Sequence, residues 1–280
     1  MNFFNLDIND NKILYKLSKS TSKLVIDLNT NNRINIKNRY QIYTDTANKF
    51  CLKDLKPINI SNEFKNNLID LYDSDLAALS YIKKYRDSNA YYTCSLCGSP
   101  ASGTLDHFLP KKTFPEFSFY SKNLIPACAC NFSKSKKISN MFHPQFFDFL
   151  VNRIYKIEFQ ITDGRINNIK LSPTIKNHHP YYELIESHLN NHILPCTKNI
   201  INFMREKIQS IYDTPSDYLA ALDEIKITQK KQLRKIISQQ LRRDTRKFKT
   251  VNSWDSLALA SFLQKEIFNK FYDRIIEVQK

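Results

Sequence analysis

The sequence of 280 residues has no long hydrophobic run, and none of its apolar stretches approaches the roughly 20 residues that a membrane-spanning helix requires. Its opening stretch, MNFFNLDINDNKILYK, carries acidic residues early and lacks the unbroken apolar segment of a secretory signal. Internal repeats and low-complexity linkers are absent as well. These absences argue against a membrane protein and favour a globular protein of the cytoplasm with one or two domains.

Glycine is scarce, and its distribution sets one part of the chain apart. Residues 88–150 hold two of the three glycines, Gly98 and Gly103, together with five of the ten prolines. Because these residue types concentrate turns, we expect a loop-rich module there. The predicted division is therefore an N-terminal segment (1–87), a central module (88–150) and a C-terminal region (151–280).

Acidic residues are also in short supply, with 27 Asp and Glu against 42 Lys and Arg, for a formal net charge of +15. A charge of this size favours polyanionic partners, nucleic acid above all. A composition that is rich in Asn and Lys for reasons unrelated to function would give the same net charge. Charge alone therefore does not decide between the two interpretations.

Cysteine is present in a pattern that points to metal binding. Six cysteines in a chain expected to be cytoplasmic are not typical of a disulfide scaffold, and four of them fall within 37 residues. Cys94 and Cys97 precede a glycine that lets the backbone turn, as in half of a zinc knuckle, and Cys128 and Cys130 supply a second pair. An all-thiolate zinc site has no open position, so its role would be structural.

The remaining two cysteines, Cys51 and Cys196, stand alone in the sequence and are expected to be buried small apolar groups.

Hydrophobic periodicity predicts the elements before the module. KLVIDL and RINIKNRYQIYT alternate with period two around the turn-like NTNN, which predicts a hairpin or meander within residues 1–60. From Ser61 the spacing becomes helical and predicts a helix to Lys84, with YDSD as a break. The N-terminal segment is thus expected to be α/β.

After the module, YKIEFQITDGRINNIKLS predicts two strands joined at Asp163-Gly164. Helices are expected near 180–192 and 197–212, from Ser216 to Phe248, and after Ser253. The fold class is therefore predicted to be α+β, with a mainly helical C-terminal region.

The motifs CSLCG, LDHFLPK and NLIPACACNFSKS together resemble the HNH endonuclease family, a ββα-metal nuclease module supported by paired cysteines on zinc. The resemblance covers about 55 residues, from 94 to 150. It implies that His107 is the general base and that Asp106 and Asn131 hold a catalytic divalent ion. It further implies that Asn123 braces the loop behind the histidine and that Lys134 faces phosphate.

The chemistry of phosphodiester hydrolysis suits these residue types. The reaction needs an activated water and neutralisation of the charge on the phosphate oxygens. A histidine ionises near neutral pH, so His107 could take the proton. Asp106 with the amide oxygen of Asn131 offers hard ligands, as Mg²⁺ or Mn²⁺ prefers, while most coordination positions stay with water and phosphate.

The sequence departs from the family at the second cysteine pair, which has one intervening residue where the family usually has two. Two thiolates so close can still bind one zinc ion, but the start of the following helix must then shift. The departure leaves open whether Cys130 closes the site and where Asn131 lies.

Other polar residues near the motif are secondary candidates. Lysines flanking it are expected to contact the nucleic-acid backbone: Lys111, Lys112, Lys136 and Lys137, in addition to Lys134. His143, in MFHPQFF, either contacts metal or phosphate or packs beside Pro144 and the aromatic residues. The run from Lys230 to Lys249 is either a docked helix with a solvated basic face or a phosphate-tracking surface.

These observations predict a metal-dependent endonuclease that hydrolyses phosphodiester bonds in DNA. Two alternatives stay open: an RNA or transfer-RNA nuclease with the same site, and a non-catalytic zinc-dependent protein that only binds nucleic acid. Stand-alone restriction-like enzymes fit the pattern, as do nuclease subunits of bacterial antiphage systems such as Septu-like or retron-associated ones. The latter would imply a regulatory partner such as an ATPase.

Overall fold

A computed structural model of the chain describes residues 1, 6–87, 93–100, 103–133, 141–197 and 200–280. The helices that precede the central module are α1 (Asp10–Leu17), α2 (Thr30–Asn48), α3 (Asn62–Leu71) and α4 (Ser80–Asp87). The module contains strands β1 (Thr104–His107) and β2 (Leu124–Ala127) and the short helix α5 (Cys130–Ser133). The C-terminal region contains β3 (Tyr155–Thr162), β4 (Arg165–Pro173), α6 (Tyr182–His188), α7 (Leu194–Cys196), α8 (Ile200–Asp213), α9 (Ala221–Glu224), α10 (Lys230–Phe248), α11 (Trp254–Ser261) and α12 (Lys265–Val278).

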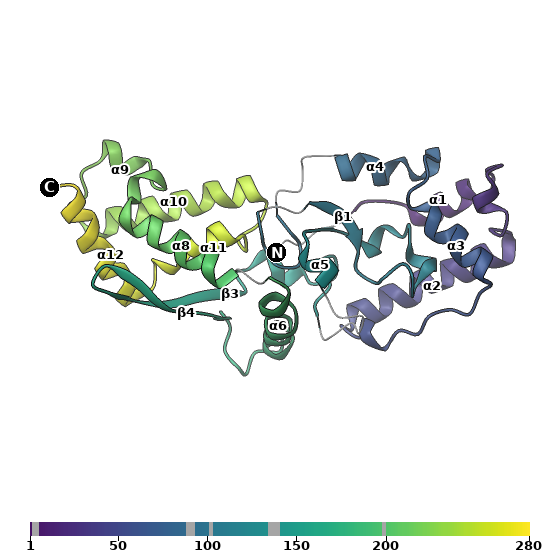
Figure 1. Cartoon of the computed structure of the whole chain (residues 1–280), viewed down its shortest axis with the longest axis horizontal. Helices are drawn as coiled ribbons and strands as arrows, with labels where there is room; N and C mark the ends of the chain where they lie inside the picture. The colour runs from purple at the N-terminus through teal and green to yellow at the C-terminus, as the bar shows by residue number, and fades with distance from the viewer. Residues whose placement is uncertain (2–5, 88–92, 101–102, 134–140, 198–199) are drawn as a thin grey trace.

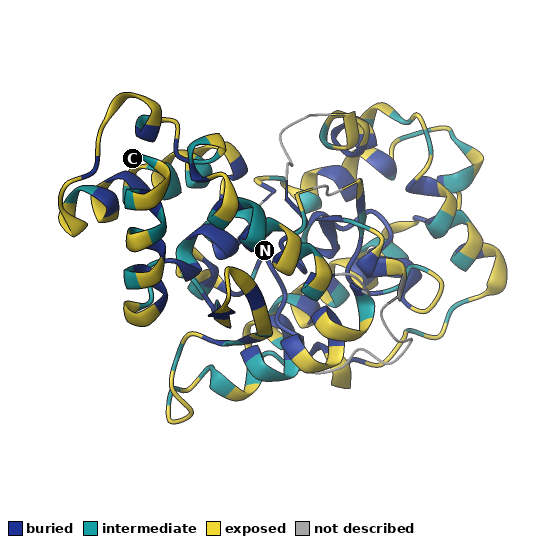
Figure 2. Ribbon diagram, turned by 60° about the vertical axis from the view of Figure 1, so that its left-hand side comes forward, coloured by how far each residue is buried: buried dark blue, intermediate teal, exposed yellow. Residues whose placement is uncertain are grey.

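The molecule is elongated (Figure 1). Helices α1 to α4 lie at one end, the β3–β4 hairpin with helices α8 to α12 lies at the other, and β1, α5 and α6 lie between them. One continuous hydrophobic core nevertheless joins the three parts, since its buried residues range from Met1 to Ile275. Figure 2 shows these buried segments concentrated in the middle of the molecule and on the inner sides of the helices.

The fold class is α+β with small antiparallel sheets, as predicted. The prediction of an α/β N-terminal segment is wrong, because the described residues before the module form helices and no strand. In RINIKNRYQIYT the buried side chains are Ile36, Tyr40 and Tyr43, which recur at helical spacing. The apolar residues that completed the alternation, Ile34 and Ile42, are 48% and 44% exposed. The pattern of apolar residues fitted both a strand and a helix, and only the residues at helical spacing pack against the core.

The helix expected from Ser61 to Lys84 is present and broken at YDSD, as predicted. Ser61 caps α3 by accepting a hydrogen bond from the backbone N–H of Phe64. At the break between α3 and α4, the hydroxyl of Tyr72 donates a hydrogen bond to the carbonyl of Leu105 in β1. The N-terminal helices are thus fixed directly to the strand that carries the Asp-His pair.

The hairpin of β3 and β4 is confirmed, with Thr162 paired to Arg165 and the turn at Asp163-Gly164. Both turn residues have positive φ angles, +50° and +72°, as the two central residues of a type I′ turn require. Helix α8 packs against β4, and α11 and α12 pack against β3. The C-terminal region is therefore a hairpin covered by helices.

The long helix expected from Ser216 is shorter than predicted, since α10 begins only at Lys230. The preceding backbone is held in place by Gln279, whose amide bonds the carbonyls of Leu222 and Ile225 and the N–H of Ile227. The helix expected after Ser253 is divided into α11 and α12. Gln264 occupies the break and donates to the carbonyl of Ile157 in β3. Both differences arise from contacts between residues distant in sequence.

In the part of the chain that the structure describes, no helix is both long enough and apolar enough to cross a membrane.

Candidate active site and metal centre

The central module places Asp106, His107 and Asn131 together at the junction of β1, β2 and α5. Strand β1 pairs antiparallel with β2, and Asp106 and His107 stand opposite Ile125 and Leu124. Helix α5 begins three residues after β2 ends and carries Asn131 in its first turn. A strand, a returning strand and a short helix therefore bring a carboxylate, an imidazole and an amide to one place.

Asp106 is the best exposed of the three side chains, at 22%. One of its oxygens, Oδ1, accepts the backbone N–H of His107 at 2.7 Å, and the other, Oδ2, accepts from the amide of Asn131. Burial by itself would raise the pKa of Asp106, but the interactions with His107 and Asn131 lower this pKa to about 2. The carboxylate is therefore ionised at any pH near neutrality, which is the form that holds a cation.

The ring of His107 is 5% exposed and has a defined tautomer. Its Nε2 lies 2.8 Å from the carbonyl oxygen of Ser118, and because a carbonyl only accepts, Nε2 must carry the proton. The lone pair of the neutral ring is then on Nδ1, which lies 3.4 Å from Oδ1 of Asp106. A proton taken up by Nδ1 would create an imidazolium held between a carbonyl and a carboxylate, an arrangement that suits a general base.

Asn123 braces the loop that follows His107, which is the role that its place in the motif implied. The side chain is fully buried. Its Oδ1 accepts the backbone N–H of Leu109 at 2.7 Å, and its Nδ2 donates to the carbonyls of Leu109 and Phe117, each at 3.1 Å. The loop contains Ser118, so this bracing also fixes the carbonyl that orients the His107 ring.

His143 lies in the interior, behind the braced loop, and is 2% exposed. Its Nδ1 accepts the backbone N–H of Gln145, so Nε2 is the donor toward the Tyr43 hydroxyl at 3.0 Å. Tyr43, from α2, in turn donates to Oδ1 of Asn123 at 3.0 Å. The suggested contact of His143 with phosphate or metal is therefore replaced by packing and by support for Asn123, because both ring nitrogens are engaged inside the protein.

Asn131 is buried and joins α5 to β1. Its Nδ2 donates to Oδ2 of Asp106 and, at 3.3 Å, to the carbonyl of His107. A cation bound by both Asp106 and Asn131 would need the amide oxygen of Asn131 at the position where Nδ2 lies. A rotation of the terminal amide by half a turn would bring the oxygen there. One ionised carboxylate and one amide are hard oxygen donors, so the residues present fit a divalent cation such as Mg²⁺ that keeps most of its water ligands.

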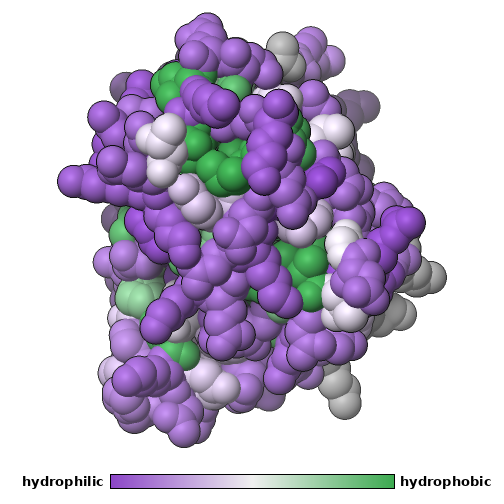
Figure 3. Space-filling model, turned by 90° about the vertical axis from the view of Figure 1, so that its left-hand side faces the viewer, coloured by the Kyte–Doolittle hydropathy of each residue, from purple (hydrophilic) through white to green (hydrophobic). Residues whose placement is uncertain are grey.

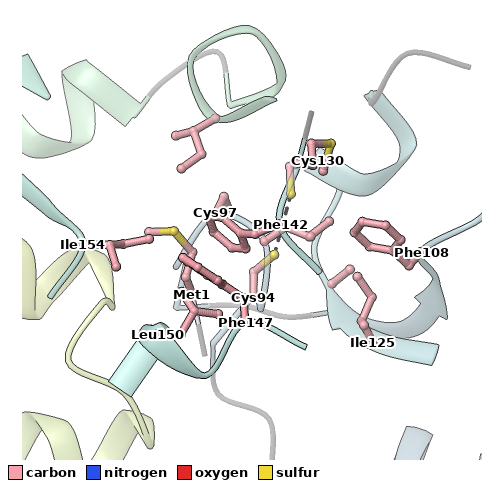
Figure 4. Packing of buried hydrophobic residues seen from close by; sticks show 14 of the residues in the cluster. Met1, Cys94, Cys97, Phe108, Ile125, Cys130, Phe142, Phe147, Leu150 and Ile154 are labelled. Atoms are coloured by element: carbon pink, nitrogen blue, oxygen red, sulfur yellow. Dashed lines mark hydrogen bonds between the residues drawn. The ribbon is translucent and has the colours of Figure 1, made fainter. Parts of the chain in front are cut away.

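Beside these residues, the four cysteines of the module form one cluster. Their Sγ atoms all lie within 4.8 Å of one another, with Cys94 3.6 Å from Cys130 and Cys97 3.5 Å from Cys128. Four thiolates around one zinc ion at about 2.3 Å would be roughly 3.8 Å apart, so the cluster has the dimensions of a tetrahedral site. Figure 4 shows Cys94, Cys97 and Cys130 facing one another among buried apolar side chains, with the Cys94–Cys130 contact dashed.

The cluster includes Cys130, so the short Cys128-Ala-Cys130 spacing does not keep this thiol away from the other three. The backbone N–H of Cys130 points at Sγ of Cys128, and the N–H of Cys128 points at Sγ of Cys94, both at 3.4 Å. Burial opposes ionisation of Cys94, but hydrogen bonds with Cys128 and Cys130 hold the pKa of Cys94 well below its ordinary value. These contacts favour the thiolate of Cys94, which is the form that binds metal, whereas hydrogen bonding with Cys128 raises the pKa values of Cys97 and Cys130.

The turn after Cys97 is held by the C-terminal region. Gly98 has a φ of +81°, and a Cβ at this position would lie 2.3 Å from the carbonyl oxygen of Asn252. Trp254 donates its ring N–H to the carbonyl of Cys97 at 2.7 Å and its backbone N–H to that of Gly98 at 3.0 Å. The glycine is therefore required for both its backbone conformation and the close approach of a distant segment.

The predicted phosphate contacts are only partly described. Lys111 is near the site, with Nζ 4.7 Å from the centre of the Tyr72 ring and 3.0 Å from the carboxylate of Asp73. Lys112 is exposed. The other three, Lys134, Lys136 and Lys137, lie outside the described residues.

Residues from the N-terminal helices complete the surroundings of His107, and sequence reasoning missed them. The ring of Tyr72 lies 4.3 Å from that of His107 between centroids, and the Arg86 guanidinium lies 4.9 Å from the Tyr72 centroid. Asp73 pairs with both Lys111 and Arg86. A cavity of about 660 Å³ is lined by the segment that connects α3 to α4 and by α4 itself. The only sequence signal here was the helix break at YDSD, which gave no indication of what it faced.

Comparisons with known proteins leave the family of the chain open. No family model and no solved structure matches it. Protein ea31 of Escherichia phage lambda is 28% identical over 116 residues, an alignment that covers 36% of this chain and 38% of that protein. The matched part is thus well under half of the curated relative.

Proposed function

We propose that this chain is a metal-dependent endonuclease of the HNH type that hydrolyses phosphodiester bonds, with DNA as the preferred substrate. One observation carries the proposal: an ionised carboxylate, an imidazole of defined tautomer and an amide meet at the end of a strand and the start of a helix, beside a cluster of four cysteines. A protein that only binds nucleic acid would have no need for this combination.

His107 acts as the general base. Its Nδ1 takes a proton from the water that attacks phosphorus, while Nε2 keeps its hydrogen bond to the Ser118 carbonyl. The new bond joins the water oxygen to phosphorus, and the bond from phosphorus to the leaving sugar oxygen breaks. Asp106 stabilises the imidazolium that results, because its carboxylate lies 3.4 Å from Nδ1.

Asp106 and Asn131 would hold the divalent cation, Mg²⁺ or Mn²⁺. When bound, this ion neutralises charge on the phosphate oxygens and stabilises the leaving oxygen. Asn123 contributes by position only, since its four hydrogen bonds are all with protein groups that shape the loop. Lys111 and Arg86 supply positive charge on the side of Tyr72, where a substrate phosphate adjacent to the cleaved bond would pass.

The cysteine cluster takes zinc and has a structural role. Four thiolates leave no coordination position for water or substrate, so such an ion does no chemistry. It would instead fix the start of α5, and with it Asn131, against the turn that precedes β1. The described residues of the module form two four-residue strands and one short α-helix, which by themselves make too small a core to hold these residues.

The test is incubation of the purified chain with supercoiled plasmid, linear duplex, single-stranded DNA and total RNA, with Mg²⁺ or Mn²⁺ and with no divalent ion. Ion-dependent nicking of DNA is the expected result, with the His107→Ala chain as the inactive control. Cleavage of RNA alone would instead indicate a ribonuclease. Tight binding without any cleavage would indicate a binding protein or a nuclease that requires a regulatory partner such as an ATPase.

Asp73 is expected to restrain substrate binding, because it pairs with both cations next to the site. Replacing Asp73 by Asn removes this competing anion and should tighten binding of a DNA duplex a few-fold, the size expected for exposed ion pairs. Fluorescence anisotropy at fixed salt measures the change. The exposed Asp70, on α3 near the same segment, gives the matched control Asp70→Asn. Equal effects of the two substitutions would mean that net charge alone is responsible.

A further inference from the structure

Helix α10 and the residue that follows it carry about half of the net positive charge of the molecule. From Lys230 to Lys249 there are nine Lys and Arg residues against one acid, Asp244. This net charge of +8 within 20 residues compares with +15 for the whole chain. The proposed active site does not use these charges.

One face of α10 packs against the protein, and several of its cations lie on the opposite, exposed face. Leu233, Ile236 and Ile237 are buried against the C-terminal core. At about 100° per residue, the side chains of Lys231, Lys235, Arg242 and Arg246 fall within a sector of roughly 60° on the opposite side. All four are exposed. We refer to these four residues as the basic row, and it extends over about 22 Å along the helix.

The basic row has no internal counter-charge. Among the described residues, no carboxylate forms an ion pair with any of the nine cations. Two cations at the edge of the helix lie over aromatic rings of α12, with Lys230 over Tyr272 and Arg234 over Phe268. Four like charges held on one rigid face repel one another, and a polyanion would relieve that cost.

We propose that the basic row binds the phosphate backbone of double-stranded DNA without regard to base sequence. This choice of partner rests on the proposed function. Charge complementarity supports it, and so does the surface around the C-terminal helices, which is mainly hydrophilic with a few separate hydrophobic patches (Figure 3). A single strand would need exposed aromatic side chains for base stacking, whereas the one aromatic residue of α10, Phe248, is buried.

The basic row is rigidly connected to the module that carries the active site. The carbonyl of Phe248, at the end of α10, accepts a hydrogen bond from Thr93 at 3.2 Å, just before the first cysteine pair. Trp254 and Asn252, which follow the helix, contact the turn at Gly98. Duplex bound to α10 would thus be bound to the same folded unit as His107, so the row should raise substrate affinity without taking part in the reaction.

The experiment measures binding of a fluorescent 30-base-pair DNA duplex to the full chain over a range of salt, with no divalent cation so that nothing is cleaved. The paired substitutions Lys231→Gln with Lys235→Gln, and Arg242→Gln with Arg246→Gln, should each weaken binding at least tenfold at low salt. Each pair should also reduce the slope of log K against log salt by about 1.8, because each phosphate contact contributes about 0.9. The melting temperature should not change, since the four side chains are exposed.

Lys12→Gln with Lys16→Gln is the matched control, because these lysines are also exposed and four residues apart, on α1 at the other end of the molecule. Affinity and slope equal to those of the control would overturn the proposal. So would an effect confined to duplex RNA, polyglutamate or phosphatidylserine vesicles, tested in parallel. Because cleavage is not measured here, a failure of the basic row leaves the plasmid test of nuclease activity unaffected.

In cleavage assays the same substitutions should raise KM and leave kcat unchanged, as expected for residues that bind the substrate away from the reacting bond.

Discussion

Replacing His107 by alanine is expected to lower the rate of DNA cleavage by about 10²- to 10⁴-fold, the contribution typical of a positioned general base. The effect should appear in kcat, because the proposed mechanism places the ring against the reacting water and not against the parts of the duplex that provide affinity. Single-turnover cleavage of a labelled duplex at saturating enzyme measures this step. Duplex binding without divalent ion, measured in parallel, should stay within a few-fold of the parent.

Stability must be separated from chemistry in this variant. His107 is buried and donates to the carbonyl of Ser118, so its removal should cost on the order of 1–3 kcal/mol of unfolding free energy. Melting temperature and zinc content should therefore be recorded with the rate. His178→Ala is the matched control, since His178 is exposed and in another part of the chain. If folded His107→Ala protein cuts as fast as the parent, another group takes the proton.

The local part of the site could be predicted from sequence because its residues are brought together by short-range geometry. Asp106 and His107 are neighbours on one strand, and Asn131 lies just past the returning strand. Such a hairpin followed by a helix constrains positions separated by few residues. The cysteine cluster was predictable for the same reason, and even the unusual Cys128-Ala-Cys130 spacing could be accommodated by local turns.

Contacts across long sequence separations could not be predicted. Tyr72, Arg86 and Tyr43 reach the module from helices whose own sequences specify only which face is buried. The alternation in RINIKNRYQIYT was misinterpreted for the same reason, since burial of Tyr40 and Tyr43 depends on a loop some 80 residues away, where Tyr43 bonds Asn123. The role of His143 could not be predicted either, because it depends on the contact with Tyr43. The sequence does not say where the side chain of a histidine beside a motif points until the surrounding fold is known.

The four-cysteine site makes a second strong prediction, and Cys130 is the residue that tests it most sharply. Cys130→Ser keeps the size of the side chain but replaces a thiolate ligand by a hydroxyl. Because metal binding contributes about 10–16 kcal/mol in small zinc modules, loss of one ligand should lower the zinc content well below one ion per chain. The melting temperature should fall by about 10 °C or more. Elemental analysis and thermal unfolding measure the two together.

Cys51→Ser is the control, because Cys51 lies outside the cluster and its thiol donates to the backbone carbonyl of Lys49. Cobalt substitution adds an independent measurement, since thiolate-to-cobalt absorption should diminish in Cys130→Ser and remain in Cys51→Ser. Full metal content and an unchanged melting temperature in Cys130→Ser would mean that the ion is held by Cys94, Cys97 and Cys128 alone. A site with three thiolates keeps an open position, and the metal would then have to be considered as a participant in the chemistry and not only as a support for Asn131.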